Sequence, residues 1–488
     1  MIEMNLRELL KNVDIKEMKG SDNVRVKGIS KDSREVSDGY LFFMTKKNRI
    51  YLQEVKNKGV KVVITDIDED LSSVPCVVKV PDVEKVMGQI ASTFYGEPSK
   101  DIFITGITGT NGKTTTCFLI DSILQTAGTK QAIIGTIFYR YNGYVIKAEN
   151  TTPGAIELQR ILRQMKDAGV THLTMEVSSH SLEQKRVEGV NFDICIFTNL
   201  SHDHLDYHGE FSAYRNAKAL LFQYYLEKSS KPEKTAILNG DDPNVSYMIP
   251  ESKNVKIFYY GFTNEYHAKL VRYNQNIDGM EIEFSLFGEK IKLKSRLIGN
   301  FNIYNILAAS LACKIMGMEP DLIKKGIENF HGVPGRLERV INQKGYQIFI
   351  DYAHTPDALK NVLNVLSDLK RGRLLVVFGC GGDRDRQKRP VMGRIASTLA
   401  DFSIITSDNP RSEDPNQIIE EIKKGIVGEN YKVVIDRKEA IYEAIKMMNS
   451  DDILLIAGKG HEDYQIIGGK IIRFNDREVA EEILSVAL

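Results

Sequence analysis

A glycine-rich segment at residues 106–116, Gly-Ile-Thr-Gly-Thr-Asn-Gly-Lys-Thr-Thr-Thr, constrains the fold more than any other feature of this chain. It follows an apolar run, residues 102–104, and precedes a helix-like run, residues 117–124. This order is typical of a phosphate-binding loop, because glycines let backbone N–H groups turn toward an anion at the positive end of a helix. Lys113 adds a positive charge, and the Thr114 hydroxyl can bind Mg²⁺. The segment therefore predicts a nucleoside triphosphate site.

The spacing of this segment differs from that of the plain P-loop. Five residues separate Gly106 from Gly112, where the usual pattern has four. The alternative is a helix start with an accidental Gly-Lys-Thr. We favour the nucleotide site because the strand, loop and helix signals coincide.

The composition is that of a globular protein, with 42% hydrophobic and 27% charged residues. Lys+Arg and Asp+Glu are both 65, so no net charge favours nucleic acid or a membrane surface. The start lacks the pattern of a signal peptide, and no apolar run approaches the ~20 residues of a spanning helix. The scattered cysteines argue against zinc or disulfides and for a reducing cytosol. We therefore expect a cytoplasmic protein without membrane insertion. The cysteines are Cys76, Cys117, Cys195, Cys313 and Cys380.

A chain of 488 residues is too long for one ordinary core and predicts three domains. Breaks at residues 96–99 and 332–335 divide it into residues 1–99, 100–332 and 333–488. Short apolar runs alternate with helical stretches, which indicates an α/β fold with mostly parallel sheets. We expect a small N-terminal α/β domain, a central P-loop-type domain and a C-terminal Rossmann-like domain. Ligands in such folds bind beyond the carboxyl ends of the strands.

Two polar segments follow strands of the central domain. Glu176 ends one strand and is a candidate Mg²⁺ ligand beside Thr114; the alternative is a solvated carboxylate. Residues 198–209 contain three histidines and two aspartates. A zinc site is possible, but no cysteine or His-Glu-x-x-His accompanies them. We expect surface histidines for most of the three and a second Mg²⁺ site for one.

The last domain carries four more polar segments after its strands, at residues 351–356, 379–390, 408–411 and 458–462. Each has a plain alternative, such as a helix cap or a solvated basic loop. Both charge signs converge at these strand ends, however. Because buried unpaired charges are costly, this pairing indicates a zwitterionic substrate.

Together these motifs resemble the Mur ligase superfamily of ATP-dependent amide-forming enzymes, and within it the MurE branch, which adds 2,6-diaminopimelate. The resemblance covers nearly the whole chain, and the joint order of its motifs is specific. The landmarks are residues 32–34, 109–116, 150–153, 176–180, 203–209, 214–218, 239–242, 299–305, 334–336, 351–356 and 458–462.

The resemblance implies a cytoplasmic step of peptidoglycan synthesis with two small-molecule substrates, UDP-MurNAc-L-Ala-D-Glu and meso-diaminopimelate. The first domain would hold the UDP end, the central domain ATP and Mg²⁺, and the last domain the amino acid. ATP would phosphorylate the D-glutamate carboxylate, and the incoming amine would attack the acyl phosphate. The protein would then contribute positioning and charge neutralisation. Because the ATP and amine sites would lie on different domains, we expect rigid-body domain closure, and we expect a monomer.

The resemblance also assigns residues. The catalytic set is Lys113, Glu176, His204 and Lys218, the last as a carbamate (N6-carboxylysine). The metal ligands are Thr114, Glu176, His204 and carbamylated Lys218. ATP would contact Gly109, Thr110, Asn111, Gly112, Lys113, Thr114, Thr115, Asn302, Asn305, Arg336 and Asp351. The UDP-linked dipeptide would contact Ser33, Asn150, Thr151, Thr152, Ser178, Gln184 and Arg186. Diaminopimelate would contact Arg384, Asp408, Asn409, Pro410, Arg411, Gly458 and Glu462.

The choice of amino acid is predicted from Asp408-Asn409-Pro410-Arg411, a sequence motif similar to that of the diaminopimelate-adding type. A guanidinium grips a carboxylate in a bidentate manner and would repel a side-chain ammonium. The segment after Phe43 departs from the family, because residues 44–50 lack the usual glycine-containing loop and are several residues short. A lysine-adding ligase, or a paralogue with another acyl acceptor, is therefore the alternative within the superfamily.

Three readings lie outside this branch. A P-loop GTPase is disfavoured because the chain has no Asn-Lys-x-Asp motif. A folylpolyglutamate-synthetase-like ligase is disfavoured by the motifs at residues 408–411 and 458–462. The non-enzymatic alternative is a degenerate nucleotide-binding scaffold, against which the intact catalytic set counts.

Overall fold

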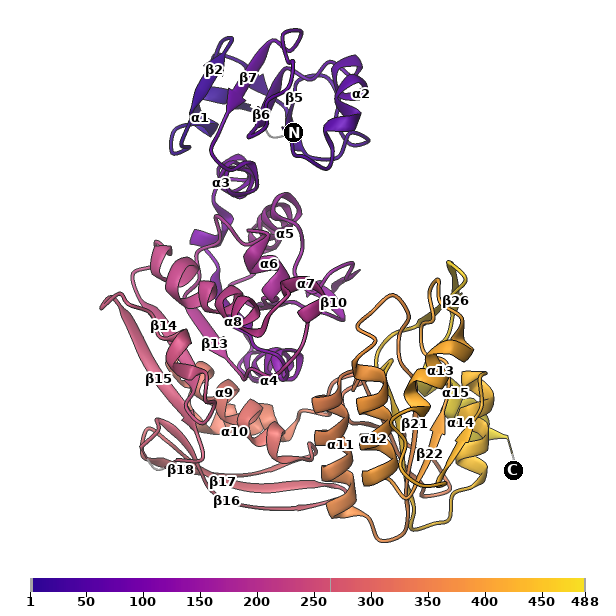
Figure 1. Ribbon diagram of the computed structural model, residues 1–488. Helices are drawn as coiled ribbons and strands as arrows, with labels where there is room; N and C mark the ends of the chain where they lie inside the picture. Colours follow the sequence, from indigo (N-terminus) through magenta and orange to yellow (C-terminus); the bar gives the residue numbers. More distant parts are fainter. Residues whose placement is uncertain (1–2, 264, 487–488) are drawn as a thin grey trace.

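The computed structural model describes residues 3–263 and 265–486 and has three α/β parts that follow one another along the chain (Figure 1). The first part is built on a five-stranded sheet, in which β4, β5, β6 and β7 are parallel and β2 pairs antiparallel with β7. Its strands, in sheet order, are β2 (Glu17–Lys19), β7 (Cys76–Lys79), β6 (Val62–Thr65), β5 (Tyr40–Met44) and β4 (Gly28–Ser30). A small pair, β1 (Met4–Asn5) and β3 (Arg25–Val26), and three helices, α1 (Leu6–Leu9), α2 (Leu52–Asn57) and α3 (Val83–Phe94), complete it.

The short segment after β5 is held by one side chain. Asn48 accepts a hydrogen bond from the Thr45 backbone N–H (2.7 Å) and donates to the carbonyl oxygens of Lys31 (2.8 Å) and Phe43 (2.9 Å). This segment is therefore an ordered turn tied to the ends of β4 and β5.

The central part carries an eleven-stranded sheet whose middle strands are parallel and whose two edges are antiparallel. Its order is β11 (Tyr144–Lys147), β10 (Phe138–Tyr141), β9 (Gln131–Ile134), β12 (His172–Glu176), β8 (Phe103–Thr108), β13 (Ile194–Phe197), β14 (Lys234–Asn239), β15 (Val255–Gly261), β16 (Ala268–Asn276), β17 (Gly279–Leu286) and β18 (Glu289–Ser295). The helices are α4 (Lys113–Thr126), α5 (Ala155–Asp167), α6 (Ser179–Glu183), α7 (Leu205–His208), α8 (Phe211–Leu220), the π-helical turn Leu221–Leu226, α9 (Asn300–Ile315) and α10 (Pro320–Glu328).

Each face of the central sheet has its own core, because successive side chains of a strand point to opposite faces. On β13, Ile194 and Ile196 pack with α4, α9 and α10, whereas Cys195 and Phe197 pack with α5 and the π-helical turn. All four side chains are buried. The apolar runs of these strands therefore reflect burial on both faces, as the sequence predicted.

The last part has a six-stranded sheet in which only the edge pair β19–β20 is antiparallel. Its order is β19 (Glu338–Arg339), β20 (Gln347–Asp351), β24 (Ile453–Ala457), β21 (Leu374–Phe378), β22 (Phe402–Ile405) and β23 (Tyr431–Val433). One core packs α11 (Pro356–Leu369), α12 (Lys388–Leu399) and α13 (Pro415–Lys423) on one face, and a second packs α14 (Arg437–Lys446) and α15 (Asp476–Ser485) on the other. A hairpin of β25 (Tyr464–Ile467) and β26 (Lys470–Arg473) follows β24.

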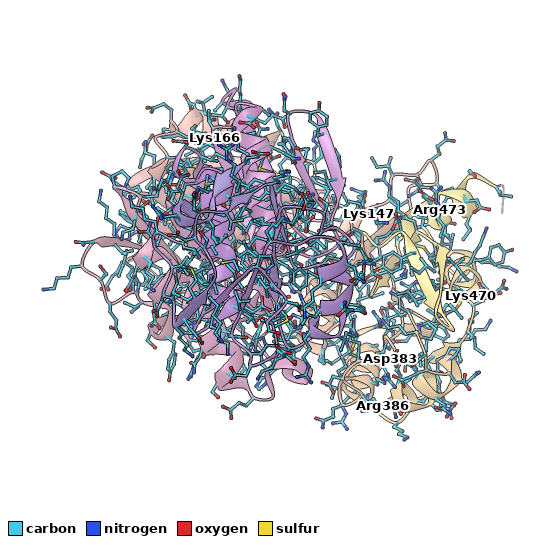
Figure 2. All side chains as sticks on the ribbon, turned by 90° about the horizontal axis from the view of Figure 1, so that it is seen from above. Lys147, Lys166, Asp383, Arg386, Lys470 and Arg473 are labelled. Atoms are coloured by element: carbon cyan, nitrogen blue, oxygen red, sulfur yellow. The ribbon has the colours of Figure 1, made fainter. Side chains whose placement is uncertain are left out.

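This arrangement confirms the predicted fold class, with a mostly parallel central sheet and a Rossmann-like last domain. The domain boundaries at residues 99/100 and 332/333 stay predictions; each falls between two of the sheets. The hairpin β10–β11 reaches the last domain through Lys147, whose Nζ lies 3.0 Å from Asp463 Oδ1 (Figure 2). Within the described part of the chain, no helix has the length and apolar character needed to cross a membrane.

Candidate active site

The glycine-rich loop connects β8 to α4, as its sequence predicts. Gly109 and Gly112 have φ values of 149° and 88°, in the region that favours glycine. A Cβ at Gly112 would lie 2.4 Å from Asn305 Oδ1, so the loop packs closely against α9. Lys113 Nζ donates to the carbonyl oxygens of Gly109 (2.9 Å) and Thr110 (2.8 Å). Burial lowers the pKa of Lys113, which an anionic phosphate would offset.

Glu176 lies at the carboxyl end of β12, next to the loop, and is 1% exposed. Thr114 Oγ1 donates to Glu176 Oε2 at 3.0 Å. Thr136 donates to the same carboxylate from its backbone N–H (2.9 Å) and its hydroxyl (3.1 Å). A Cβ at Gly135 would lie 2.5 Å from Glu176 Oε1, so this approach requires a glycine. Carboxylate and hydroxyl oxygens are the ligands that Mg²⁺ prefers, so the two predicted ligands Thr114 and Glu176 meet.

Lys218 projects from α8 into the same region and is 1% exposed. Its Nζ donates to the Gly109 carbonyl oxygen at 2.7 Å and lies 4.6 Å from the centre of the Tyr214 ring. Burial, reinforced by the nearby charge of Lys113, lowers the pKa of Lys218 well below its usual range. A lysine in a helix is usually a solvated surface residue, so only the family resemblance indicated a role for Lys218.

His204 follows β13 in a left-handed backbone conformation, with φ of 55°. Its Nε2 lies 3.5 Å from Asp203 Oδ2, and its ring packs 4.8 Å from that of His180. Burial lowers the pKa of His204 to about 4, so the imidazole is neutral and able to bind a cation. Among the described residues, no group of three or more histidines, cysteines or acids is arranged as a metal site.

Most residues predicted for the muramoyl dipeptide form one hydrogen-bonded group beside Glu176. The Thr152 hydroxyl donates to the Glu176 carbonyl oxygen (2.9 Å) and accepts from the Ser178 N–H (3.2 Å). Arg186 donates to the Thr152 carbonyl oxygen (3.0 Å) and to Gln184 Oε1 (2.9 Å).

The other three residues predicted for the dipeptide make different contacts. Thr151 joins this hydrogen-bonded group through the Thr136 hydroxyl, 3.1 Å away. The Asn150 carbonyl oxygen accepts from Tyr139 (2.6 Å). Ser33 lies apart in the first domain, where it donates to Glu54 Oε2 at 3.0 Å.

The residues predicted for the adenosine side come from two domains. Asn305 donates to Asn302 Oδ1 (2.9 Å) and accepts from Thr116 Oγ1 (3.3 Å), which ties this pair to α4. Arg336 lies over the Tyr352 ring at 4.7 Å, and its buried Nε has no hydrogen-bond partner among the described residues. The charge of Arg336 contributes to the lowered pKa of Lys113, which places it near the phosphate loop.

Asp351 lies at the end of β20 and accepts a hydrogen bond from the Leu337 N–H at 2.7 Å. Burial raises the pKa of Asp351 to about 6, although the charge of Arg336 opposes the shift. The two predicted adenosine-side residues of the last domain therefore influence one another.

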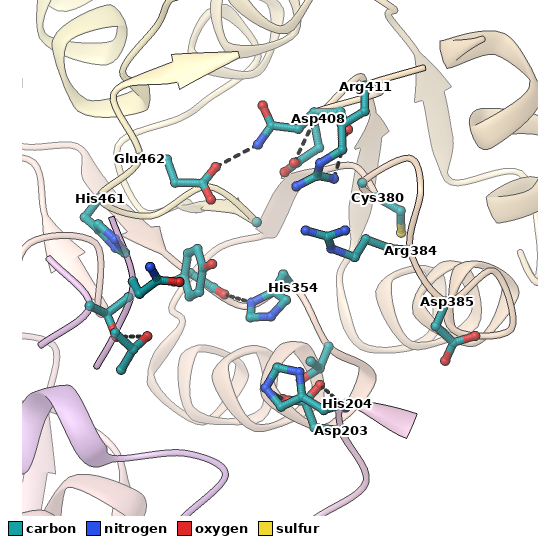
Figure 3. A pocket seen from close by; sticks show the side chains of 18 of the residues that line it. Asp203, His204, His354, Cys380, Arg384, Asp385, Asp408, Arg411, His461 and Glu462 are labelled. Atoms are coloured by element: carbon teal, nitrogen blue, oxygen red, sulfur yellow. Dashed lines mark hydrogen bonds and ion pairs between the residues drawn. The ribbon is translucent and has the colours of Figure 1, made fainter. Parts of the chain in front are cut away.

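A cleft of about 1210 Å³ separates the central and last domains. Figure 3 shows Arg384, Arg411, Asp408 and Glu462 around its last-domain wall. Of the residues predicted for the dipeptide, Asn150 and Thr151 line the opposite wall, whereas Thr152, Ser178, Gln184 and Arg186 do not line the cleft. The predicted site residues that line the cleft are Asn150, Thr151, His204, Arg384, Asp408, Asn409, Arg411, Gly458 and Glu462. The cleft lining does not include Pro410 or the predicted ATP residues.

The charged groups of the last-domain wall are held by neighbouring side chains and by the backbone. Asn409 Nδ2 and Lys459 Nζ donate to Glu462 Oε2 at 2.8 and 3.1 Å. Arg411 Nη1 donates to the Gly382 carbonyl oxygen at 2.8 Å. A Cβ at Gly458 would lie 2.6 Å from Asp408 Oδ2. The wall therefore presents two guanidiniums and two carboxylates, which matches a zwitterionic ligand.

Sequence reasoning missed three residues. Thr136 lies just beyond the carboxyl end of β9, a position that marks ligand sites in such sheets. Lys459 is fully buried within a motif already noted for its neighbours. Asp357 at the start of α11 accepts from Asn111 Nδ2 (3.3 Å) and Ser201 Oγ (3.1 Å), and so joins the last domain to the phosphate loop.

Comparison with known proteins identifies the family. Residues 107–313 match the Mur ligase middle domain, and residues 335–460 match the Mur ligase glutamate ligase domain. A protein from Halalkalibacterium halodurans named UDP-N-acetylmuramoyl-L-alanyl-D-glutamate–2,6-diaminopimelate ligase is 43% identical, over 95% of both chains. The chain belongs to the Mur ligase family.

Further relatives agree with this Mur ligase assignment. Proteins of the same name from Geobacter metallireducens and Clostridium botulinum are 42% and 41% identical, over 97% and 99% of both chains. A solved structure of a ligase of that name is 32% identical with a TM-score of 0.72, covering 99% of this chain and 98% of the other. The MurF ligase of Thermotoga maritima, solved in complex with ADP, shares the fold at 16% identity with a TM-score of 0.62, over 94% of this chain and 97% of the other.

Proposed function

We propose that this Mur ligase joins meso-2,6-diaminopimelate to UDP-MurNAc-L-Ala-D-Glu at the expense of ATP, in the cytoplasmic synthesis of peptidoglycan. Relatives named for this reaction are similar over nearly the whole chain. One structural observation carries the proposal. Two arginines and two carboxylates of the last domain line the same cleft as Asn150 and Thr151 of the central domain.

A carboxylate must be activated before an amine can attack it. Phosphorylation by ATP converts the D-glutamate carboxylate into an acyl phosphate with a good leaving group. Lys113 and the N–H groups at the start of α4 would hold the transferring phosphates. The dipeptide group, which the Thr152 hydroxyl ties to Glu176, would bring the acceptor carboxylate close to these phosphates. Catalysis is then mainly positioning and charge neutralisation.

The residues present fit Mg²⁺. Thr114 Oγ1 and Glu176 Oε2, only 3.0 Å apart, would hold one ion, and His204 with a carbamate on Lys218 would hold a second. Bound there, Mg²⁺ neutralises charge on the phosphoryl group during transfer. The lowered pKa of Lys218 supports the carbamate, because only a neutral amine combines with CO₂.

Selection of the amino acid rests on Arg411. A guanidinium forms a bidentate pair with the distal carboxylate of diaminopimelate, whereas the side-chain ammonium of lysine would face a positive charge. Arg384 adds a second positive charge to the same wall, and Asp408 and Glu462 are available to the ammonium groups.

The decisive measurement is phosphate release from ATP with UDP-MurNAc-L-Ala-D-Glu and, in parallel, meso-diaminopimelate, lysine or ornithine. We expect turnover with diaminopimelate and at least about 100-fold less with lysine, since an unpaired buried charge costs several kcal/mol. Turnover only with lysine would contradict the Arg411 assignment. No turnover with any amine would point to another acyl acceptor, in line with the shortened loop after Phe43.

A further inference from the structure

The amine of an amino acid enters the site as an ammonium, which has no electron pair for attack on an acyl phosphate. One proton must leave it first, and this step needs an acceptor beside the amine site. Two histidines that line the cleft belong to the last domain, His354 and His461. The other cleft histidines lie on the central domain, with the His180 ring 4.1 Å from that of Tyr207 and the His202 ring 4.7 Å from that of Phe211.

His354 has one ring nitrogen committed and one available. Its Nδ1 lies 2.8 Å from the Tyr352 carbonyl oxygen. A carbonyl oxygen can only accept, so Nδ1 carries the hydrogen. In the neutral ring Nε2 then holds a lone pair, and the backbone contact fixes both the tautomer and the orientation of the ring.

The position of His354 suits proton transfer from the amine. In Figure 3 it lies between Arg384 of the last-domain wall and His204 of the central domain. Lys388 Nζ donates to the His354 carbonyl oxygen at 3.0 Å, which joins the histidine to the start of α12. His354 therefore lies between the side chains proposed for the amino acid and those proposed for Mg²⁺.

The charges around His354 favour a neutral imidazole. Burial, together with Lys388 and Arg336, lowers the pKa of His354, while Asp203 and the contact with the Tyr352 carbonyl oppose the shift. His204 and His461 also face it, and both are neutral because burial lowers the pKa of His204 to about 4 and that of His461 to about 3. The same cations also lower the pKa of a substrate ammonium, which favours loss of its proton.

Two other acceptors on this wall, His461 and Glu462, are less suited. Burial lowers the pKa of His461 to about 3, so its ring is a weak base. Glu462 Oε2 accepts hydrogen bonds from Asn409 and Lys459, and these contacts oppose protonation of the carboxylate, although burial raises its pKa.

We propose that His354 is the general base that removes a proton from the attacking amino group, through its Nε2 atom. The inference rests on the proposed ligase function. The N–H bond of the ammonium breaks, its electron pair stays on nitrogen, and His354 becomes an imidazolium. The nitrogen then bonds to the acyl carbon, and the bond from that carbon to the phosphate oxygen breaks with its electron pair on phosphate. The departing phosphate takes the second amine proton, and His354 returns its proton to water.

The test separates activation of the carboxylate from attack by the amine. His354→Asn removes the basic nitrogen and keeps an N–H that can donate to the Tyr352 carbonyl oxygen. Hydroxylamine is already an unprotonated nucleophile at neutral pH, so it traps the acyl phosphate as a hydroxamate without a base. We expect His354→Asn to form hydroxamate from ATP and UDP-MurNAc-L-Ala-D-Glu at the wild-type rate. Amide formation with diaminopimelate should fall about 10²- to 10⁴-fold in kcat.

Two further readouts distinguish a base from a binding or structural residue. Log kcat of His354→Asn should rise with pH with a slope near one, and added imidazole should restore part of the rate. His331→Asn changes an exposed histidine and is the matched control. Equal loss of hydroxamate and amide, or a raised KM for diaminopimelate with unchanged kcat and pH profile, would overturn the inference. Absence of both products from the wild type would instead overturn the proposed function.

Discussion

Lys218 Nζ donates a hydrogen bond to the Gly109 carbonyl oxygen at 2.7 Å, which links α8 to the first glycine of the phosphate loop. The side chain is buried, and its amine has no carboxylate among its hydrogen-bond partners in the described residues. A charged lysine in this place is unfavourable beside Lys113, whereas a carbamate would replace the positive charge by a negative one and offer oxygen ligands.

Replacing Lys218 by alanine should therefore abolish ligation. We expect kcat to fall more than about 100-fold. Loss of a residue that only hydrogen-bonds to a metal ligand typically costs about 10- to 100-fold in activity, and loss of the ligand itself should cost more. Short carboxylates such as formate or acetate should restore part of the rate by supplying the missing oxygens. The matched control is Lys253→Ala, a lysine outside the site. Full activity of Lys218→Ala would contradict the carbamate assignment.

Replacing Arg411 by alanine should weaken binding of the amino acid without affecting ATP. Loss of a buried charge pair costs roughly 2–5 kcal/mol, which corresponds to a rise of about 30-fold or more in KM for diaminopimelate. Steady-state kinetics with each substrate varied in turn checks this, and Arg394→Ala on the exposed side of α12 is the control. A change in the KM for ATP alone would show that this motif serves the nucleotide.

The sequence predicted the fold class and the placement of the phosphate loop because both depend on local signals. Apolar runs buried on two faces mark the parallel strands, and Gly109 and Gly112 adopt the positive φ angles that the loop requires. Contacts across domains carry no such signal. Nothing in the sequence near Asp357 indicates its bonds to Asn111 and Ser201, because the fold alone brings these segments together.

Replacing Thr136 by valine should raise the Mg²⁺ concentration needed for half-maximal activity. The valine keeps the shape and the backbone N–H bond to Glu176 but removes the hydroxyl that donates to Oε2 at 3.1 Å. Outer partners of metal ligands typically contribute 10- to 100-fold in affinity or activity, so an increase of about 10-fold or more is expected. A Mg²⁺ titration of phosphate release measures it, with Thr171→Val, an exposed site, as the control. An unchanged titration would show that Thr136 does not orient Glu176.

Asp351 should make the stability of the nucleotide-free protein depend on pH. Burial raises the pKa of its carboxyl to about 6, so the folded chain binds this proton more tightly than the unfolded chain, in which the value is about 3.9. The free energy of unfolding must therefore fall as pH rises from about 4 to about 6, by up to about 3 kcal/mol for this group. Asp351→Asn, neutral at every pH, should lack that part of the slope and gain stability relative to the wild type above about pH 6. Urea unfolding of both proteins across this range measures the difference, with Asp368→Asn, an exposed aspartate on α11, as the control. If the wild type instead became more stable than Asp351→Asn as pH rises, Arg336 would keep Asp351 charged. The attraction between the two charges would then outweigh the effect of burial on the Asp351 pKa.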